Sequence, residues 1–146
     1  MEIVKLLIES GADVNIMDEN AQTPLYIACA ENHIDIVRVL LEHNAIVDLT
    51  GDTVTPLIIA CICGNYEVVC ILIEYGADVN YVDDEGRTAL FYSKIRGYVN
   101  RRKYERIEEA LLSSGAKISV RDKEGISIKD LDNPEICKRM YQELYG

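Results

Sequence analysis

One short sequence, Thr-Pro-Leu, recurs along the chain at nearly constant spacing. It occupies 23–25 and, 32 residues later, 55–57, and the near copy Thr-Ala-Leu follows after 33 more residues at 88–90. A second marker related to Gly-Ala-Asp-Val-Asn keeps the same period, at 11–15, 44–48, 76–80 and 115–119. Two markers in phase indicate that one small unit is repeated in tandem. Units of this length stack into solenoids, which form long binding surfaces more often than enclosed active sites.

Composition narrows the class of partner. Lys and Arg number 15 against 25 Asp and Glu, so the formal net charge of the 146 residues is −10. Charge of this sign opposes binding to nucleic acid or to an anionic membrane surface, and no apolar run approaches the length of a membrane span. The five cysteines are an odd number. They therefore predict reduced thiols and an intracellular location, cytoplasmic or nuclear.

Residues 18–50 show the physical logic of one repeat. A polar turn precedes Thr23, which is expected to cap a short helix with proline at its first position. A second helix starts at about Asp35 and carries one apolar stripe. Asn44 ends it, where other repeats have glycine and the backbone needs a left-handed residue. The buried side of the first helix is expected to come from Leu25, Ile27, Ala28 and Cys29.

The turn, the Thr-Pro-Leu helix, the second helix and the Gly-Ala-Asp-Val-Asn ending together resemble the ankyrin repeat. The likeness covers nearly the whole chain. It implies an all-α solenoid of stacked helix–turn–helix repeats with short β-hairpin tips, in a single domain of residues 1–146. We assign a half repeat to 1–17, full repeats to 18–50, 51–82 and 83–121, and a truncated capping repeat to 122–146.

The resemblance also implies a binding surface, because members of this family mostly bind other proteins through the hairpin tips and the exposed side of each first helix. At the tips the matching positions are Glu19, Asn20, Gln22, Thr50, Asp52, Val54, Val82, Asp84, Glu85, Arg87 and Lys123. On the first helices they are Ala30, Glu31, Ile62, Cys63, Ile95 and Arg96. This surface is apolar in the middle and acidic at the edge. The expected partner is therefore a protein with an apolar anchor beside basic residues, unless the tip charges serve only solubility.

The third full repeat contains six extra residues. Gly97 matches Gly64, so we expect the insertion to lie between the two helices, around residues 98–105. This segment is basic, and its cations are Arg96, Arg101, Arg102, Lys103 and Arg106. It is either a solvated loop and helix start or a docking site for an acidic segment or a phosphate group of a partner.

The beginning of the sequence aligns with a second helix, because residues 2–8 match 35–41. A half repeat leaves Val4, Leu7 and Ile8 partly uncovered. Two explanations are open at this point. The chain is cut from an array with further N-terminal repeats, or another copy covers this end by self-association.

No motif predicts catalysis, a cofactor or a metal site. Cys61, Cys63 and Cys70 lack the paired spacing and the histidine of a zinc site. His33 and His43 stand at predicted helix boundaries without a nearby nucleophile, and neither a phosphate loop nor a nucleophile elbow is present. The expected function is a non-catalytic protein-interaction module, an adaptor or scaffold. The alternative is a stoichiometric inhibitor or regulatory subunit that clamps an enzyme such as a kinase.

Overall fold

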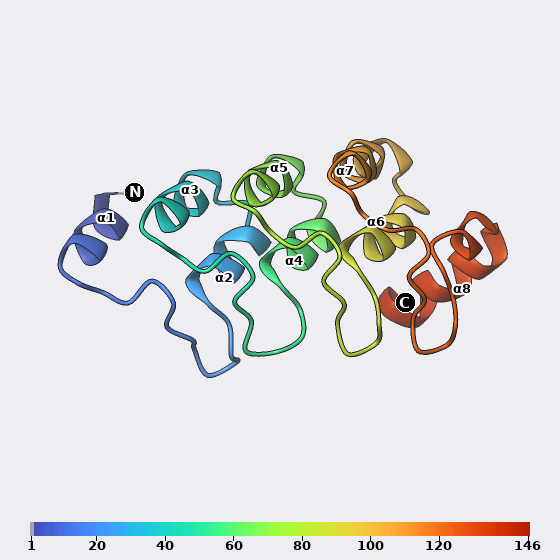
Figure 1. Cartoon of the computed structure of the whole chain (residues 1–146), viewed down its shortest axis with the longest axis horizontal. Helices are drawn as coiled ribbons and strands as arrows, with labels where there is room; N and C mark the ends of the chain where they lie inside the picture. Colours follow the sequence, from blue (N-terminus) through green and yellow to red (C-terminus); the bar gives the residue numbers. More distant parts are fainter. Residues whose placement is uncertain (1) are drawn as a thin grey trace. The chain divides into compact units, whose positions relative to one another are not determined.

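The computed structural model describes residues 2–146 and divides the chain into two compact units, unit 1 up to Asp78 and unit 2 from Val79. Unit 1 consists of α1 (Glu2–Glu9), α2 (Pro24–Ala30), α3 (Ile34–Glu42), α4 (Pro56–Cys63) and α5 (Tyr66–Glu74) (Figure 1). Unit 2 consists of α6 (Ala89–Gly97), α7 (Arg101–Ser113), the short 3₁₀ helix η1 (Asp130–Asp132) and α8 (Pro134–Tyr145).

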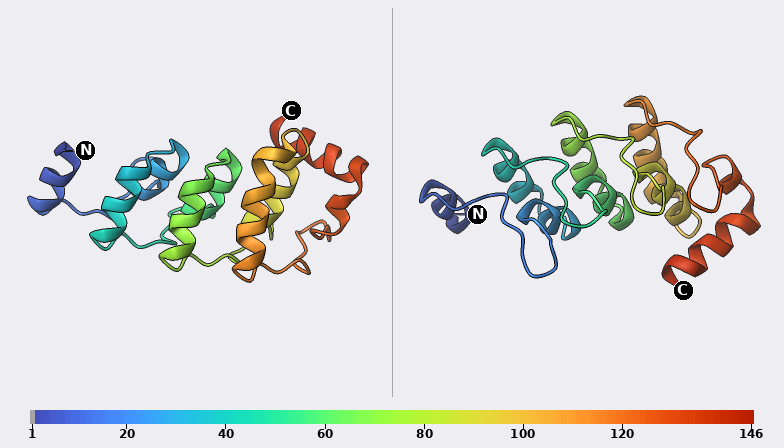
Figure 2. Two further views of the ribbon diagram at one scale, coloured as in Figure 1. Left: turned by 90° about the horizontal axis from the view of Figure 1, so that it is seen from above. Right: turned by 60° about the horizontal axis from the view of Figure 1, so that its bottom comes forward.

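Stacked helix–turn–helix pairs make up unit 1, as the repeats predict. The helices form two layers, with α1, α3 and α5 in one and α2 and α4 in the other (Figure 2). Helix α2 packs against both α3 and α4, and α4 packs against α5. Apolar side chains between the layers are almost fully buried, among them Leu25, Cys29, Val37, Leu57, Cys61 and Leu72. Ile27 was expected in this core but is 41% exposed.

The predicted helix starts are confirmed. The hydroxyl oxygens of Thr23, Thr55 and Thr88 each accept a hydrogen bond from the amide three residues on, at 3.1, 3.3 and 3.3 Å. Each bond satisfies an amide that has no partner inside the helix. The predicted stop at Asn44 is confirmed as well, because its φ is 67°, in the left-handed region.

The tips contain little β-structure. Among residues 2–146 the one isolated bridge joins Arg121 and Ser127, and no strand is present. Side chains rather than β-ladders hold the connecting segments to the next repeat. The Asn15 side chain accepts a hydrogen bond from the Ile46 amide, 31 residues on, at 2.8 Å and donates one to the Asn44 carbonyl oxygen at 3.5 Å. Asn80 makes the same pair of bonds in unit 2, at 2.8 and 3.1 Å.

Asp48 holds the equivalent place in the middle repeat and makes only half of this contact. Its carboxylate accepts from the Asp78 amide at 3.0 Å, but a carboxylate has no N–H to donate to a carbonyl. Burial raises the pKa of Asp48 above its ordinary value of 3.8. The hydrogen bond from the Asp78 amide lowers this pKa, whereas the negative charge of Asp78 raises it further. Asp48 therefore binds its proton more tightly in the folded state, so stability falls as pH rises through the raised pKa.

We expect Asp48→Asn to raise the free energy of unfolding by about 1 kcal/mol at neutral pH. The asparagine side chain still accepts the hydrogen bond from the Asp78 N–H, adds an N–H that can donate to a carbonyl, and carries no charge. Urea unfolding at about pH 4 and about pH 7 checks this. The gain should be larger at the higher pH, where wild-type Asp48 is ionised. An equal gain at both pH values would contradict the electrostatic part of the explanation.

Unit 2 departs from the predicted repeat at the insertion. Gly97 lies inside α6 and does not have the left-handed conformation of Gly64, whose φ is 72°. Their predicted equivalence is therefore wrong. Asn100 accepts from the Lys103 amide at 3.2 Å and caps α7, which has 13 residues against 9 in α5. The extra residues thus mainly lengthen the second helix.

The last helix begins as predicted, with Asn133 accepting from the Glu135 amide at 3.0 Å and proline at the first helical position. Only the short η1 remains where a first helix would stand. Helix α8 packs against α6 and buries Cys137 and Met140. The side of α6 that faces α8 is therefore covered within unit 2.

Candidate protein-binding surface

Each tip is folded around one polar side chain. Asp18, Asp83 and Asp122 use one carboxylate oxygen to accept the amides two and four residues on, at 2.9–3.0 Å. At the remaining tip, the Thr50 hydroxyl donates to the Asp52 carbonyl at 2.6 Å, and the Asp52 amide lies 3.2 Å from the same oxygen. Such local bonds fix a turn without help from the residues between them. The intervening side chains are left free to face solvent.

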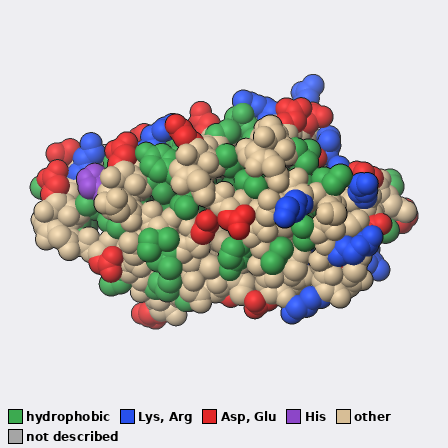
Figure 3. Space-filling model, viewed as in Figure 1, with side chains coloured by type: hydrophobic (Ala, Val, Ile, Leu, Met, Phe, Trp, Pro, Cys, Tyr) green, Lys and Arg blue, Asp and Glu red, His purple; other side chains and the backbone are tan. Residues whose placement is uncertain are grey.

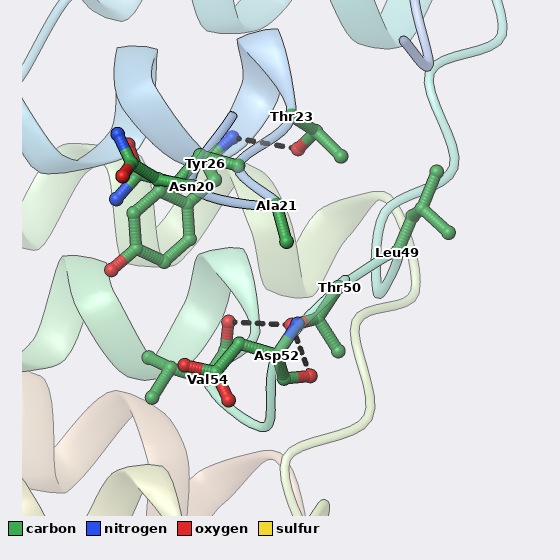
Figure 4. A pocket seen from close by; sticks show the side chains of 9 residues that line it. Asn20, Ala21, Thr23, Tyr26, Leu49, Thr50, Asp52 and Val54 are labelled. Atoms are coloured by element: carbon green, nitrogen blue, oxygen red, sulfur yellow. Dashed lines mark hydrogen bonds between the residues drawn. The ribbon is translucent and has the colours of Figure 1, made fainter. Parts of the chain in front are cut away.

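The first two tips of unit 1 meet around a small pocket. Figure 4 shows Asn20 and Tyr26 on one side of it and Asp52 and Val54 on the other. The enclosed volume is about 30 Å³, which is room for about one or two water molecules. The two tips therefore form a shallow shared surface suited to a protein and not a cavity for a small ligand.

Gly51 allows this close approach. A Cβ placed on it would lie 2.7 Å from the carbonyl oxygen of Ala21 and 2.6 Å from the sulfur of Met17. Neither distance is possible for a real Cβ, so any larger residue at position 51 must push the tips apart.

We call the surface around this pocket the tip surface of unit 1. Burial, reinforced by Cys63 and Asp52, raises the pKa of Tyr26. Its phenol therefore stays protonated at neutral pH and can donate a hydrogen bond. The predicted contact residues on this unit all retain exposed or half-exposed side chains, namely Glu19, Asn20, Gln22, Ala30, Glu31, Thr50, Asp52, Val54, Ile62 and Cys63.

Two predicted contact residues of unit 2 are wrong, because they are buried. Arg87 is only 7% exposed; its Nε donates to Asp122 at 3.3 Å, and its guanidinium lies 5.6 Å from the centre of the Phe91 ring. Ile95 is fully buried on α6, the helix against which α8 packs. Exposed predicted positions in this unit are Val82, Asp84, Glu85 and Lys123, the last 3.7 Å from Glu85 in an ion pair.

The basic cluster of unit 2 is partly engaged within the chain. Arg96 donates to the Tyr104 hydroxyl at 3.3 Å, and its guanidinium lies 4.6 Å from the centre of the Tyr145 ring. Arg101 donates to both carboxylate oxygens of Glu108 at 3.0 Å. Arg102, Lys103 and Arg106 are exposed on α7. A role for this cluster in binding an acidic partner stays a prediction.

Charge is distributed very unevenly along the chain. Unit 1 has only two basic residues, Lys5 and Arg38, against thirteen acidic ones, a net charge of −11. Unit 2 has thirteen basic and twelve acidic residues, a net charge of +1. On the visible face, Lys and Arg side chains gather over unit 2 (Figure 3). Unit 1 thus carries the acidic excess of the chain.

Within residues 2–146, no group of three or more Cys, His, Asp and Glu side chains is placed to hold a metal ion. The five cysteines are thiols and form no disulfide, and Cys29, Cys61 and Cys137 are buried. His43 contacts the Val39 carbonyl oxygen at 2.8 Å and so serves its own helix. None of the described helices has the length and apolar character that crossing a membrane requires.

Comparison with known proteins agrees with the repeat pattern. The sequence model of a family described as ankyrin repeats (3 copies) matches residues 1–83 and 55–122. The human protein phosphatase 1 regulatory subunit 27 is 46% identical over 52 residues, which cover 36% of this chain and 34% of that protein. Bovine protein fem-1 homolog C is 42% identical over 50 residues, 34% of this chain and 8% of that protein.

Mouse ankyrin repeat domain-containing protein 63 is 40% identical over 47 residues, 32% of this chain and 12% of that protein. The matched segments thus span about a third or less of these relatives. The family match, in contrast, extends over most of the sequence. The repeated helical pairs, their threonine caps and this match together show that the chain belongs to the ankyrin repeat family.

Proposed function

We propose that this chain is a non-catalytic, intracellular adaptor or scaffold that binds a partner protein through the tip surface of unit 1. Ankyrin repeats indicate a protein-interaction module. The observation that carries the finer proposal is the combination of a preformed tip surface with a net charge of −11 on the unit that bears it. The partner segment would be basic, with an apolar anchor beside Tyr26 and Val54.

The mechanism is rigid presentation. Because side-chain bonds fold each tip before binding, association requires little ordering of the chain, and more of the contact energy appears as affinity. The acidic field of unit 1 attracts a basic segment over a distance of about 8 Å at physiological salt and raises its association rate. Binding should therefore weaken as salt is added.

A regulatory subunit of an enzyme is the second candidate. It is favoured by the similarity to a protein named as a protein phosphatase 1 regulatory subunit. The same acidic surface would then hold the enzyme instead of tethering two proteins. An activity assay on the captured partner, with and without a stoichiometric amount of this chain, separates the two candidates. A change in catalytic rate supports the regulatory subunit, and an unchanged rate supports the adaptor.

Affinity capture from native lysate tests the tip surface, using Asp52→Arg and the matched variant Glu74→Arg. Both change the charge of unit 1 equally. Position 52 lies on the tip surface, and position 74 ends α5 away from it. The bonds of Asp52 to Thr50 involve its backbone only, so the tip should remain folded.

We expect Asp52→Arg to weaken capture by about tenfold or more and Glu74→Arg to have a small effect. Equal loss in both variants would show that only the overall charge matters. Loss confined to Asp84→Arg/Glu85→Arg would place the contact on unit 2 and contradict the proposal.

A further inference from the structure

The pocket between the first two tips of unit 1 carries a specific combination of chemical groups. Its lining includes one carboxylate, from Asp52, and one aromatic ring, from Tyr26, which lie on opposite sides (Figure 4). The side-chain amides of Asn20 and Gln22 and the aliphatic side chain of Val54 also line it. None of the described residues in this lining is basic, so the pocket itself offers Asp52 no cation. We call this pocket the tip notch.

The polar side chains of the notch are left over from the folding of the tips. The turn bonds of Asn20 and Gln22 run from their backbone amides to Asp18 at 2.9 Å. The bonds between Asp52 and Thr50 likewise use the backbone of Asp52. A partner can therefore bind the Asp52 carboxylate and the two side-chain amides without breaking a bond that folds a tip.

The notch has its shape before anything binds. On one side, the Thr50 hydroxyl donates to the Asp52 carbonyl oxygen at 2.6 Å and lies 3.1 Å from that of Val54. On the other side, Tyr26 belongs to the first turn of α2, which Thr23 caps at 3.1 Å. Neither wall has to be ordered on binding, so more of the contact energy appears as affinity. The enclosed volume of about 30 Å³ limits the occupant to the flat end of one side chain.

The charge of Asp52 reaches the ring on the opposite wall. Burial is the largest cause that raises the pKa of Tyr26, Cys63 contributes next, and the Asp52 carboxylate adds to both. The face of an aromatic ring carries partial negative charge. A cation that enters between the carboxylate and the ring is therefore attracted by both walls.

Arginine matches these groups better than other side chains do. Its planar guanidinium can give two parallel hydrogen bonds to the Asp52 carboxylate while one face lies on the Tyr26 ring. Its remaining N–H groups can reach the side-chain carbonyl oxygens of Asn20 and Gln22, and its aliphatic stem can cover Val54. Lysine ends in a compact, strongly hydrated ammonium, which so shallow a notch does not strip of its water. An acidic side chain would be repelled, and an apolar one would leave the polar groups without hydrogen-bond partners.

We propose that the tip notch binds a single arginine side chain of the partner protein, with the guanidinium between Asp52 and Tyr26 and the stem over Val54. The proposal rests on the proposed function and deepens it. The acidic excess of unit 1 attracts basic segments in general, whereas the notch selects one side chain among them. The partner is then a protein whose exposed basic segment contains an arginine that lysine cannot replace.

Three capped tripeptides test this proposal, with leucine on either side of a central arginine, lysine or citrulline. Citrulline has the shape of arginine but no charge. Binding to the whole chain is followed at low salt through the amide chemical shifts. We expect the arginine peptide to bind with millimolar affinity, at least about fivefold more tightly than the lysine peptide and about tenfold more tightly than the citrulline peptide. The largest shift changes should fall at residues 20–26 and 50–54.

Equal binding of the arginine and lysine peptides would show that only charge matters and would overturn the proposal. Binding of the citrulline peptide as tight as that of the arginine peptide would overturn it as well, because the carboxylate would then have no part in recognition. Shift changes that avoid residues 20–26 and 50–54, or no binding at millimolar concentration, would have the same consequence.

Variants of both walls locate the guanidinium. Asp52→Asn keeps the shape of the side chain and removes its charge, so it should weaken binding of the arginine peptide about tenfold. Tyr26→Leu removes the ring and should weaken binding about threefold to tenfold, and Tyr26→Phe should restore it. Glu74→Gln is the matched control, because it makes the same change in charge at the end of α5, outside the notch. Equal weakening by Asp52→Asn and Glu74→Gln would contradict the proposal.

The outcomes distinguish this proposal from the proposed function. Partner capture that Asp52→Arg weakens, together with equal binding of the arginine and lysine peptides, would leave the adaptor in place and overturn the arginine site. Arginine-selective binding in the notch, together with capture that Asp52→Arg does not affect, would support the arginine site and contradict the proposed function.

Discussion

Replacing Arg87 by alanine is expected to lower the free energy of unfolding of unit 2 by about 3 kcal/mol. Arg87 joins two tips, because its guanidinium pairs with Asp122, 35 residues on, and stacks over Phe91. The Asp122 side chain is fully buried, so the variant leaves a carboxylate without its cation in a poorly hydrated place. Burial is the largest single influence on Arg87 and disfavours its charge, but the hydrogen bond to Asp122, the Asp122 charge and the interactions with Tyr92 together outweigh burial and raise the arginine pKa. The Arg87 guanidinium is therefore charged throughout the working pH range.

Urea unfolding of the whole chain, with hydrogen exchange to follow residues 79–146, measures this effect. Arg121→Ala is the matched control, because Arg121 also pairs with an aspartate, Asp130 at 3.4 Å, but its side chain is 62% exposed. Exposed pairs contribute about 0–1 kcal/mol. A similarly small loss of unfolding free energy in both variants would show that burial does not strengthen the Arg87–Asp122 pair and would contradict the prediction.

Gly51→Val is expected to destabilise unit 1 by about 1–3 kcal/mol and to remove the tip surface as a binding site. The added Cβ meets the Ala21 carbonyl oxygen at 2.7 Å, and backbone cannot rotate away as a side chain can. The two tips must separate. Tyr26 and Val54 would then no longer face a common pocket, and partner binding should fall with stability.

The control is Asp52→Val, which places the same side chain on the neighbouring, exposed position. It should leave the amide chemical shifts around Ala21 unchanged, while Gly51→Val should alter them together with those of the residues near Tyr26. Unchanged shifts in Gly51→Val would mean that the tips adjust without separating and would contradict the prediction.

The features that could be predicted from the sequence are those set by neighbouring residues. Threonine followed by proline indicates a helix start because the hydroxyl reaches an amide only three residues away. Asn44 could be identified because it replaces a glycine at a fixed position in the repeat. The acidic tip residues could likewise be identified from their places in the repeat, although only the boundary at Asp78 shows that unit 1 carries the entire excess of negative charge.

Two of the failures, Arg87 and Ile95, depend on contacts made far along the chain. Arg87 was expected to face a partner, but Asp122 of the following repeat holds it in the interior. Ile95 was expected on an exposed helix face, but α8 packs against that helix. Gly97 was matched to Gly64 by residue type and by its distance from the capping threonine. The local signal for the start of α7 was Asn100, which caps that helix, and the prediction did not use it.

The way each tip is folded has a consequence for engineering. In the first tip, the Asp18 carboxylate accepts both turn bonds, one of them from the Asn20 backbone amide, while the side chains of Glu19 and Asn20 are exposed. Positions 19 and 20 can therefore be randomised in a selection library with little loss of stability, provided that position 18 stays fixed. New specificities could then be selected on this chain by varying a few codons, with the scaffold beneath them unchanged.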